Sequence, residues 1–337
     1  MSKAYYRPII TSEPIGGIAL AGGWARFEDV EVLRRDANPQ RISVEACPTD
    51  VLDQLVQARK PIAGLNLSQP NLMGILNVTP DSFSDGGLFL DAGSALSQAR
   101  LLVDDGADIL DIGGESTRPG AEVVGIEDEI SRTVPVIRSL RRSGQSVPIS
   151  IDTRKSAVAE AALDAGAAMI NDVAALTFDA DLGPLAASRN LPVCLMHAQG
   201  TPKTMQQDPT YDDVLLDVYD FLEERIVSAE KQGISRSQIL VDPGIGFGKT
   251  VAHNIRLLRG LSLFHGLGCA ILLGASRKRF IGALTGADVA SDRTSGSVAV
   301  ALEAVRQGVQ VLRVHDVKET KQALQIWQAL NGQEAQT

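Results

Sequence analysis

The chain has 337 residues, 44% of them hydrophobic and 22% charged, which is ample for one large core with an appendage. Its net charge of −9 and pI of about 5.0 argue against a general nucleic-acid binder, which would carry a basic face. No apolar run approaches the roughly 20 residues that cross a bilayer, and the first residues lack the apolar core of a signal peptide. We therefore expect a cytoplasmic protein without nucleic-acid or membrane partners.

Residues 1–68 differ from the rest of the chain and predict a small N-terminal extension that contains β-structure. Segment 24–36 has a rough alternation of apolar and polar residues and follows a glycine-rich stretch. Residues 49–59 have helical spacing behind a threonine that can cap a helix. These features indicate no role for the extension, and we place its boundary with the main domain, 69–337, at residue 68.

From residue 71 onward, short apolar runs alternate with segments of helical spacing. The runs end at Asn77, Asp111, Asp152, Asn171, His197, Asp242, Ser276 and His315. The helical segments are 94–107, 127–144, 155–167, 182–190, 211–234, 253–268, 293–308 and 318–331. Continuous apolar runs are typical of parallel strands that helices cover on both faces. The alternation predicts an α/β fold, a (β/α)8 TIM barrel, with its site at the carboxyl ends of the strands.

An open, doubly wound parallel sheet is the competing architecture, because it also binds ligands beyond the carboxyl ends of its strands. The eight units and the polar end of the last one favour the closed barrel. Two local expectations accompany this pattern. Pro135 should kink or divide the helix around it. Cys194 lies inside an apolar run and should be a buried, reduced thiol.

The last two apolar runs lead into cations. Arg313 and His315 are two residues apart on one strand, so they share a face and suit an anion such as a phosphate. A structural ion pair and a backbone-bonded histidine are the alternative. Ser276 and Lys278 share parity in the same way, and a helix that begins near them would offer free N–H groups to an anion. The cations there could also form only a solvated surface.

Acids, an amide and a histidine end the other runs. Asp111 and Asp152 either face a pocket or cap the helices that follow them. Asp242 precedes a glycine-rich turn, which lets backbone approach a ligand closely. Asn171 offers both a donor and an acceptor, and His197 fits a structural role as well as a ligand contact.

Two polar loops, 77–87 and 113–122, are longer than most connections between a strand and a helix. Phe83 is an aromatic residue in the middle of the first loop, an unusual place unless it covers something. The glycines at the bases would let either loop act as a lid over a reactive intermediate.

Motifs spread from residue 71 to residue 330 resemble those of dihydropteroate synthases. In chain order they are GILNVTPDSFSDGG, DIGGESTRPGA, ISIDTRKSAV, MINDV, LPVCLMHAQGTPKTMQ, LVDPGIGFGK, GASRKRFIG and RVHDVKE. The resemblance implies a TIM-barrel transferase of folate biosynthesis. Such an enzyme condenses 6-hydroxymethyl-7,8-dihydropterin diphosphate with 4-aminobenzoate by a dissociative displacement and releases pyrophosphate. The resemblance also implies a homodimer and a sulfonamide target.

The resemblance further implies roles for individual residues. The pterin is held by Asp152, Asn171, Asp242, Lys278 and Phe247. The diphosphate is held by Asn77, Thr117, Arg313 and His315, with Mg²⁺ bound in part by Asn77. The aminobenzoate site and its two loops comprise Asp81, Phe83, Asp85, Thr117, Arg118, Pro119, Ser276 and Arg279. The catalytic set is Asp152, Lys278, Arg313 and His315.

One departure and two rival functions accompany the resemblance. Arg279 stands where many relatives have a small hydroxyl residue, which puts its side-chain contact with aminobenzoate in question. A pterin-binding methyltransferase that uses methyltetrahydrofolate shares the fold, but it has no use for the diphosphate-binding residues. A catalytically silent pterin-binding protein should have lost loop or diphosphate residues, and none is lost here.

Overall fold

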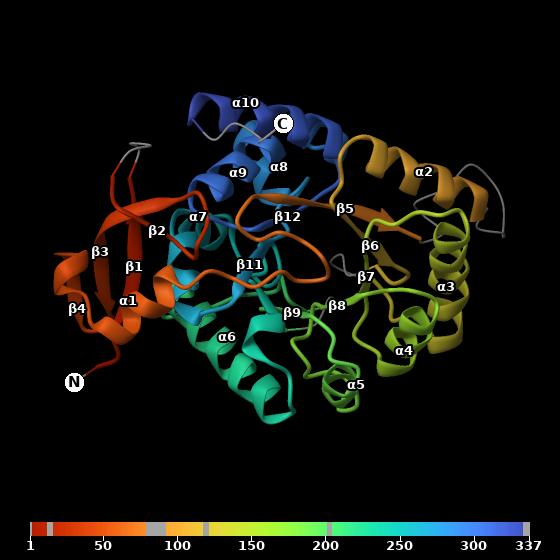
Figure 1. The fold of residues 1–337 in the computed structure, drawn as a ribbon, viewed down its shortest axis with the longest axis horizontal. Helices are drawn as coiled ribbons and strands as arrows, with labels where there is room; N and C mark the ends of the chain where they lie inside the picture. The colour runs from red at the N-terminus through yellow and green to blue at the C-terminus, as the bar shows by residue number, and fades with distance from the viewer. Residues whose placement is uncertain (1, 12–15, 79–91, 117–120, 201–203, 333–337) are drawn as a thin grey trace.

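The computed structural model describes residues 2–11, 16–78, 92–116, 121–200 and 204–332. Within this part of the chain, parallel strands close into a barrel in the order β10-β11-β12-β5-β6-β7-β8-β9, surrounded by helices (Figure 1). The two barrel strands that come first and last in the sequence, β5 and β12, also pair in parallel, with Leu72 opposite Leu312. The predicted (β/α)8 barrel is therefore confirmed, and the open sheet is excluded.

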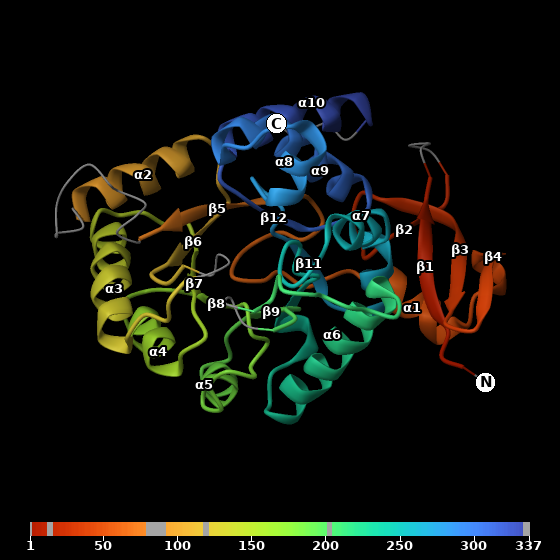
Figure 2. The same ribbon diagram turned by 180° about the vertical axis from the view of Figure 1, so that it is seen from behind.

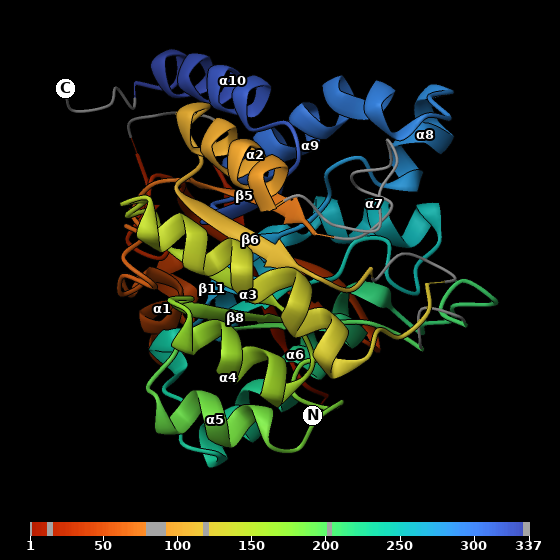
Figure 3. The ribbon, with the colours of Figure 1, turned by 90° about the vertical axis from the view of Figure 1, so that its right-hand side faces the viewer.

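The barrel strands are β5 (Asn71–Asn77), β6 (Ile109–Gly113), β7 (Ile149–Asp152), β8 (Met169–Asp172), β9 (Val193–Met196), β10 (Ile239–Asp242), β11 (Ala270–Leu273) and β12 (Val311–Val314). The α-helices around them are α2 (Ala92–Asp104), α3 (Ile126–Arg142), α4 (Ser156–Asp164), α5 (Leu182–Ser188), α6 (Val214–Lys231), α7 (Val251–Arg259), α8 (Arg279–Thr285), α9 (Thr294–Arg306) and α10 (Val317–Leu330). Short 3₁₀ turns lie at η3 (Arg236–Gln238), η4 (Leu261–Leu267) and η5 (Ala290–Arg293). Figure 3 shows the arrows of β5 and β6 pointing toward the same end of the barrel.

The structure corrects one expected helix. The segment 253–268 is not a single helix, because α7 ends at Gly260, where a side chain would lie 2.6 Å from Leu215. The 3₁₀ turn η4 then continues to the next strand. Pro135 does not divide α3, which runs through it as one helix. Of the described helices, none combines the length and the apolar character needed to cross a bilayer.

Alternate residues of each strand face the barrel interior, and their character changes along the strand. Near the amino ends the interior is apolar, with Met73, Ile109, Met169, Cys194, Leu240, Ala270, Leu272 and Val311 in one cluster. Two residues further along, the same faces carry Asp111, Asn171, Asp242 and Arg313. The interior of the barrel is thus a packed apolar core near the amino ends of the strands and a polar region near their carboxyl ends, where TIM barrels place their sites. We call this polar region, with Asp111, Asp152, Asn171, Asp242 and Arg313, the polar cup. Cys194 is a buried free thiol, as predicted.

A loop before the first barrel strand closes the apolar end of the barrel. Ile62 and Leu65 exchange two backbone hydrogen bonds, of 2.8 and 3.3 Å, to form a tight turn. Their side chains and that of Leu67 are at most 4% exposed and belong to the interior cluster. Figure 1 shows this loop crossing the barrel. The polar cup therefore opens only at the carboxyl ends of the strands.

The N-terminal extension contains β-structure, as predicted. It consists of β1 (Tyr5–Ile10), β2 (Ile18–Ala19), β3 (Arg26–Arg34), β4 (Ala37–Ser43), the 3₁₀ turn η1 (Val44–Ala46) and α1 (Thr49–Val56). The strands pair antiparallel around β3, and Phe27, Val30 and Leu55 form the centre of a separate small core. Figures 1 and 2 place the extension on the flank of the barrel, beside α6.

Specific contacts fasten the extension to that flank. The ring of Tyr5 packs edge-on against Tyr219 of α6 at 5.5 Å, and its hydroxyl donates to Asp220 at 2.8 Å. Trp24 Nε1 donates to the carbonyl of Val305 at 2.7 Å. These contacts all lie away from the polar cup.

Candidate active site

Arg313 of β12 joins two aspartates in the polar cup. Its Nε donates to Asp111 Oδ2 at 2.6 Å, and its Nη2 donates to Asp152 Oδ2 at 2.8 Å. Asn171 Nδ2 donates to the same oxygen of Asp111 at 3.0 Å. Side chains from β6, β7, β8 and β12 therefore meet at one point, although they are separated by up to 202 positions in the sequence.

Asp152 does not cap the helix that follows it. The first residue before α4 is Lys155, and the carboxylate of Asp152 is bound to Arg313 instead. Strand register places Asn77, Gly113, Asp152 and Asn171 beside one another on four successive strands. Because Gly113 has no side chain, it leaves room between the side chains of Asn77 and Asp152. A Cβ atom added there would lie 3.4 Å from that of Asp152.

Asp242 lies on the other side of Arg313. Its Oδ1 accepts a hydrogen bond from the backbone N–H of Gly244 at 2.7 Å, which fixes the carboxylate at the start of the glycine-rich turn. A second glycine keeps this region open. A Cβ atom at Gly274 would lie 3.4 Å from Asp242 Oδ2 and 3.8 Å from Arg313 Cδ. Glycines therefore leave room beside Asp152 on one side of the Arg313 guanidinium and beside Asp242 on the other.

Burial changes the protonation equilibria of these acids. It raises the pKa of Asp152 to about 7, with Arg313 opposing the shift and Asp111 adding to it. Burial also raises the pKa of Asp242, against the N–H of Gly244 and the charge of Lys278. Desolvation on its own would lower the pKa of Arg313, but Asp111 and Asp152 outweigh it and the net shift is upward. The cup contains three aspartates and one arginine, so it favours a cationic or hydrogen-bond-donating ligand beside the acids.

The segment after β11 carries the next group of polar side chains. The Nζ atom of Lys278 lies 4.0 Å from the centre of the Phe247 ring, a cation–π contact. Ser276 Oγ accepts from the backbone N–H of His315 at 3.2 Å and lies 3.0 Å from Nδ1 of the same residue. The helix predicted near these residues is α8, which begins at Arg279.

The three cations that follow Ser276, residues 277–279, have different surroundings. Arg277 has a left-handed backbone, with φ at 57°, and its N–H donates to Ser297 Oγ at 2.8 Å. Its guanidinium is paired with Asp316, so Arg277 holds the segment in place. Arg279 is exposed, whereas Lys278 lies over Phe247. Of these three cations, Arg279 is exposed, whereas Arg277 and Lys278 have partners within the fold.

Some of the expected site residues lie outside the described part of the chain. They are Asp81, Phe83, Asp85, Thr117, Arg118 and Pro119. The described base of the second loop is held by Glu115, whose Oε2 accepts from Lys155 Nζ at 2.7 Å and from the N–H of Val124 at 2.8 Å. The carboxylate of Glu115 is also paired with Arg154. Glu115 thus ties both ends of the 115–124 connection to the segment that follows β7, the strand that ends at Asp152.

Sequence reasoning left two of the structure's polar groups unassigned. Asp111 was one candidate among several, although it shares a strand face with the interior residue Ile109, and that parity could have selected it. Lys249 has no role that the sequence pattern predicts, but its Nζ lies 2.8 Å from His197 Nδ1 beside the cup, and both residues are buried. Nothing in the local sequence predicts that pairing.

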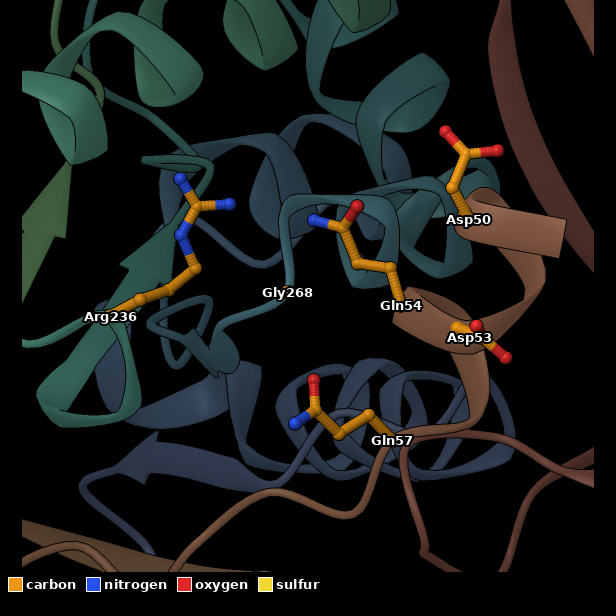
Figure 4. A pocket seen from close by; sticks show the side chains of 6 residues that line it. All are labelled: Asp50, Asp53, Gln54, Gln57, Arg236 and Gly268. Carbon is orange, nitrogen blue, oxygen red and sulfur yellow. The ribbon is translucent and has the colours of Figure 1, made fainter.

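A groove at the opposite end of the barrel has a different character (Figure 4). It is lined by Asp50, Asp53, Gln54 and Gln57 at α1, and by Arg236 and Gly268, which precede β10 and β11. Figure 4 shows Arg236 across the groove from Gln54. Arg236 is already paired with Glu230 at 2.8 Å, and the two aspartates are exposed. The groove is therefore a solvated junction between the extension and the barrel.

The fold and the polar cup together define a TIM-barrel enzyme with a charged, buried ligand site at the carboxyl end of its strands. Comparison with known proteins then gives the family. Residues 73–315 match the family described as pterin binding enzyme. The dihydropteroate synthase of Escherichia coli is 47% identical over 265 residues, which is 79% of this chain and 93% of that enzyme. That of Neisseria meningitidis serogroup B is 48% identical over 271 residues, 79% and 94% of the two chains.

Solved structures agree with this assignment. Xanthomonas albilineans dihydropteroate synthase with 4-aminobenzoic acid has a TM-score of 0.76 and 48% identity, covering 81% of this chain and 97% of that one. Yersinia pestis dihydropteroate synthase in a sulfonamide drug complex has a TM-score of 0.77 and 45% identity, covering 81% and 99%. The chain belongs to the dihydropteroate synthases, the transferases of folate biosynthesis within the pterin-binding enzyme family. The resemblance drawn from the motifs is confirmed.

Proposed function

We propose that this chain condenses 6-hydroxymethyl-7,8-dihydropterin diphosphate with 4-aminobenzoate to give 7,8-dihydropteroate and pyrophosphate. The observation that carries the proposal is the convergence of Asp111, Asp152, Asn171, Asp242 and Arg313 in the polar cup. It is supported by family membership and by a relative from Xanthomonas albilineans whose structure contains 7,8-dihydropteroate.

The pterin fits the acidic side of the cup. Its amino-pyrimidinone edge presents adjacent N–H donors, which a carboxylate such as that of Asp242 can accept in parallel. Asn171 offers both a donor and an acceptor, and Lys278 offers donors for the ring carbonyl or nitrogens. Phe247, which lies over Lys278 at 4.0 Å, supplies an apolar face for a flat heterocycle.

The diphosphate fits the side of the cup formed by Asn77, Arg313 and His315. Two of the nitrogens of Arg313 are bound to Asp111 and Asp152, and its Nη1 makes no hydrogen bond to the described residues. Thr117, outside the described residues, is proposed to complete this subsite. The positive charge of Arg313 then faces both the acids and the leaving anion.

Mg²⁺ is compatible with this corner of the cup. Among the described residues there is no group of three or more acid, histidine or cysteine side chains that could hold a metal. Mg²⁺ usually keeps several waters and takes few protein ligands beside substrate phosphates, so the single amide oxygen of Asn77 is sufficient. When bound, Mg²⁺ would neutralise charge on the departing diphosphate.

We propose a dissociative displacement as the chemical step. The bond between the exocyclic methylene carbon and the diphosphate oxygen breaks, and its electron pair leaves with the diphosphate. The dihydropterin ring stabilises the resulting cation, and ionised Asp152, which lies in the cup, stabilises it further. The lone pair of the aminobenzoate amine then forms the new C–N bond, and that nitrogen releases its proton to the departing pyrophosphate or to water. Lys278 and His315 keep the ring and the diphosphate in place.

Aminobenzoate is proposed to enter from the side of Ser276 and Arg279. Asp81, Phe83, Asp85, Arg118 and Pro119, which lie outside the described residues, are proposed to contribute to this subsite. Ser276 is 8% exposed and is oriented by His315, so a carboxylate near it would meet a fixed hydroxyl group. The exposed side chain of Arg279 is free to turn toward solvent or toward that carboxylate.

One assay tests the reaction and separates it from the two rival functions. Pyrophosphate release should require both the pterin diphosphate and 4-aminobenzoate, and 7,8-dihydropteroate should form in equal amount. Transfer of a methyl group from methyltetrahydrofolate would support the methyltransferase instead. Pterin binding without turnover would support a silent binding protein.

We also predict that sulfonamides inhibit the enzyme. The motif of the first loop contains no inserted residue, so the aminobenzoate site should accept the drug in place of the substrate. Inhibition should be competitive with 4-aminobenzoate in steady-state kinetics and should weaken as aminobenzoate is added. Full activity at drug concentrations far above that of aminobenzoate would contradict this expectation.

We further propose a cytoplasmic homodimer. Support comes from the outer surface of α10, which exposes two large apolar side chains, Ile326 by 61% and Leu330 by 81%. A second copy of the chain would cover them through a two-fold interface. The mass of the protein in solution, measured by light scattering, tests this proposal.

A further inference from the structure

Lys249 is a buried lysine that the proposed mechanism does not use. It follows the glycine-rich turn after β10 and is 3% exposed. Its Nζ lies 2.8 Å from His197 Nδ1, 3.0 Å from the carbonyl oxygen of Phe247 and 3.5 Å from that of His197. Lys249 Nζ therefore bridges the end of β9 to the turn that follows β10, and burial lowers the pKa of this amine to about 7.

His197 is built to be the acceptor in this pair. Its ring packs edge-on against Phe221 at 4.8 Å, and it is 6% exposed. Burial and the neighbouring charge of Lys249 lower the pKa of His197 well below the usual range, so the ring is neutral and Nδ1 accepts a hydrogen bond from Lys249 Nζ. The backbone N–H of His197 also donates to the carbonyl of Asp242 at 3.0 Å.

The two loops around this pair are packed as one unit. A Cβ atom at Gly244 would lie 1.8 Å from the carbonyl oxygen of His197, so only glycine fits there. Tyr211 donates to the carbonyl of Gly248 at 2.7 Å, and Gln206 donates to that of Gly246 at the same distance. The position of the turn after β10 is thus set by the loop after β9.

The turn delivers two contacts to the cup. Phe247, whose carbonyl is bound by Lys249, lies over Nζ of Lys278 at 4.0 Å. Gly246 faces the stem of Lys278, where an added Cβ atom would lie 3.2 Å from Cδ. A shift of the turn would therefore move both the aromatic face and the ammonium that the proposed function assigns to the pterin.

We propose that Lys249 is a positioning residue for the pterin subsite, acting through His197 on one side and through Phe247 and Lys278 on the other. The proposal rests on the proposed function for the identity of the ligand. Lys249 is not placed to transfer a proton, because its Nζ already faces three acceptors of the described chain. It holds the geometry in which the pterin is bound, and a misplacement of about 1 Å in such a site can cost on the order of 100-fold in rate.

The test compares a variant that removes the bridge with one that keeps it. Lys249→Met should weaken binding of the pterin diphosphate, measured by calorimetry without aminobenzoate, by about tenfold or more. The KM for aminobenzoate at saturating pterin diphosphate should stay within about twofold. His197→Asn keeps an acceptor near the position of Nδ1 and should bind pterin almost as the parent does, whereas His197→Leu should behave like Lys249→Met.

Arg141→Met is the matched control. Arg141 also bridges two loops, since it donates to the carbonyls of Gly166 and Val147, but it does so at the amino end of the barrel. This variant should lower the thermal midpoint and leave the pterin affinity unchanged. A second check is Phe247→Leu, in which adding Lys249→Met should cause little further loss of pterin affinity.

The outcomes separate the two proposals. A parent protein that neither binds the pterin diphosphate nor releases pyrophosphate would overturn the proposed function. A parent that does both, with a folded Lys249→Met variant of unchanged pterin affinity, would overturn the positioning role alone. Equal losses of pterin and aminobenzoate binding in Lys249→Met would also overturn it, because they would indicate general structural damage.

Discussion

At the scale of single residues, the cup depends on one guanidinium shared between acids. Arg313 is bound to Asp111 at 2.6 Å and to Asp152 at 2.8 Å, and Asn171 completes the hydrogen bonding of Asp111 on one oxygen. The other oxygen, Asp111 Oδ1, is buried and has no partner among the described residues. Such an acceptor is costly to bury alone, so it is a natural contact for a donor of the bound ligand.

Asp152→Asn should leave the fold intact and remove most of the activity. The amide keeps the shape and one acceptor for Arg313, but it loses the negative charge that we propose stabilises the cation. The expected fall in kcat is about 100-fold or more, the size seen when one electrostatic group of an active site is removed. Steady-state pyrophosphate release, with circular dichroism to verify folding, measures it. Turnover close to that of the parent would contradict the assigned role.

The raised pKa of Asp152, about 7, predicts an acid limb in the pH profile. The carboxylate must be ionised to act, so kcat/KM for the pterin diphosphate should fall as the pH drops below about 7. Asp111→Asn removes a neighbouring negative charge and should move this limb to lower pH. The substrate ionises in the same way whether it is assayed with the parent or with Asp111→Asn. If the acid limb of the pH profile lies at the same pH in both proteins, the pH dependence therefore comes from the substrate and not from Asp152.

At the scale of elements, the loops at the carboxyl ends are tied to one another by buried ion pairs. Lys155, the residue before α4, is paired with Glu129 of α3 at 2.5 Å and with Glu115 after β6 at 2.7 Å. The side chains of Lys155 and Glu129 are 7% and 1% exposed. The connection between β7 and α4 therefore holds both Asp152 and the base of the neighbouring loop.

Lys155→Met should destabilise the protein by about 3–5 kcal/mol, because it leaves the carboxylate of Glu129 buried without its partner. The free energy of unfolding, measured with denaturant, tests this expectation. Adding Glu129→Gln removes the stranded charge and should recover a large part of the loss. A change of less than about 1 kcal/mol for Lys155→Met would indicate that water or another group replaces the lysine.

At the scale of the whole molecule, the extension and the loop that follows it contact different parts of the barrel. The extension docks on the flank through Tyr5 and Trp24, and the loop with Ile62, Leu65 and Leu67 fills the amino end of the barrel. We propose that the two domains, divided at residue 68, unfold as one cooperative unit. The loop belongs to the barrel's core by its packing, although it precedes that boundary.

Two truncations test the cooperative unit. Removing residues 2–58 should lower the thermal midpoint but leave pterin binding, because the extension docks on the flank of the barrel through residues that do not form the cup. Removing residues 2–68 also deletes three buried side chains, each of which contributes roughly 1.5–3 kcal/mol, and should abolish a cooperative thermal transition. Calorimetry compares the two. Equal stability of both truncated chains would show that the loop is dispensable.

The sequence by itself determined the order of strands and helices and the family, and it favoured the closed barrel over an open sheet. Apolar runs that end in polar residues carry that information locally, because a parallel strand buried on both faces has no polar positions except at its ends. Parity along the last run also placed Arg313 and His315 on one face of their strand. The single helix expected over 253–268 was wrong because Gly260 is required by a contact with Leu215, which lies far away in the sequence.

Only the tertiary structure decided which polar residues touch. Arg313 and Asp111 are 202 positions apart, and Lys249 and His197 are 52 apart, so no local pattern relates them. Asp152 could have capped a helix until the structure placed it against Arg313. The physical reason is barrel closure, which brings β12 back beside β5 and turns isolated strand ends into one shared site.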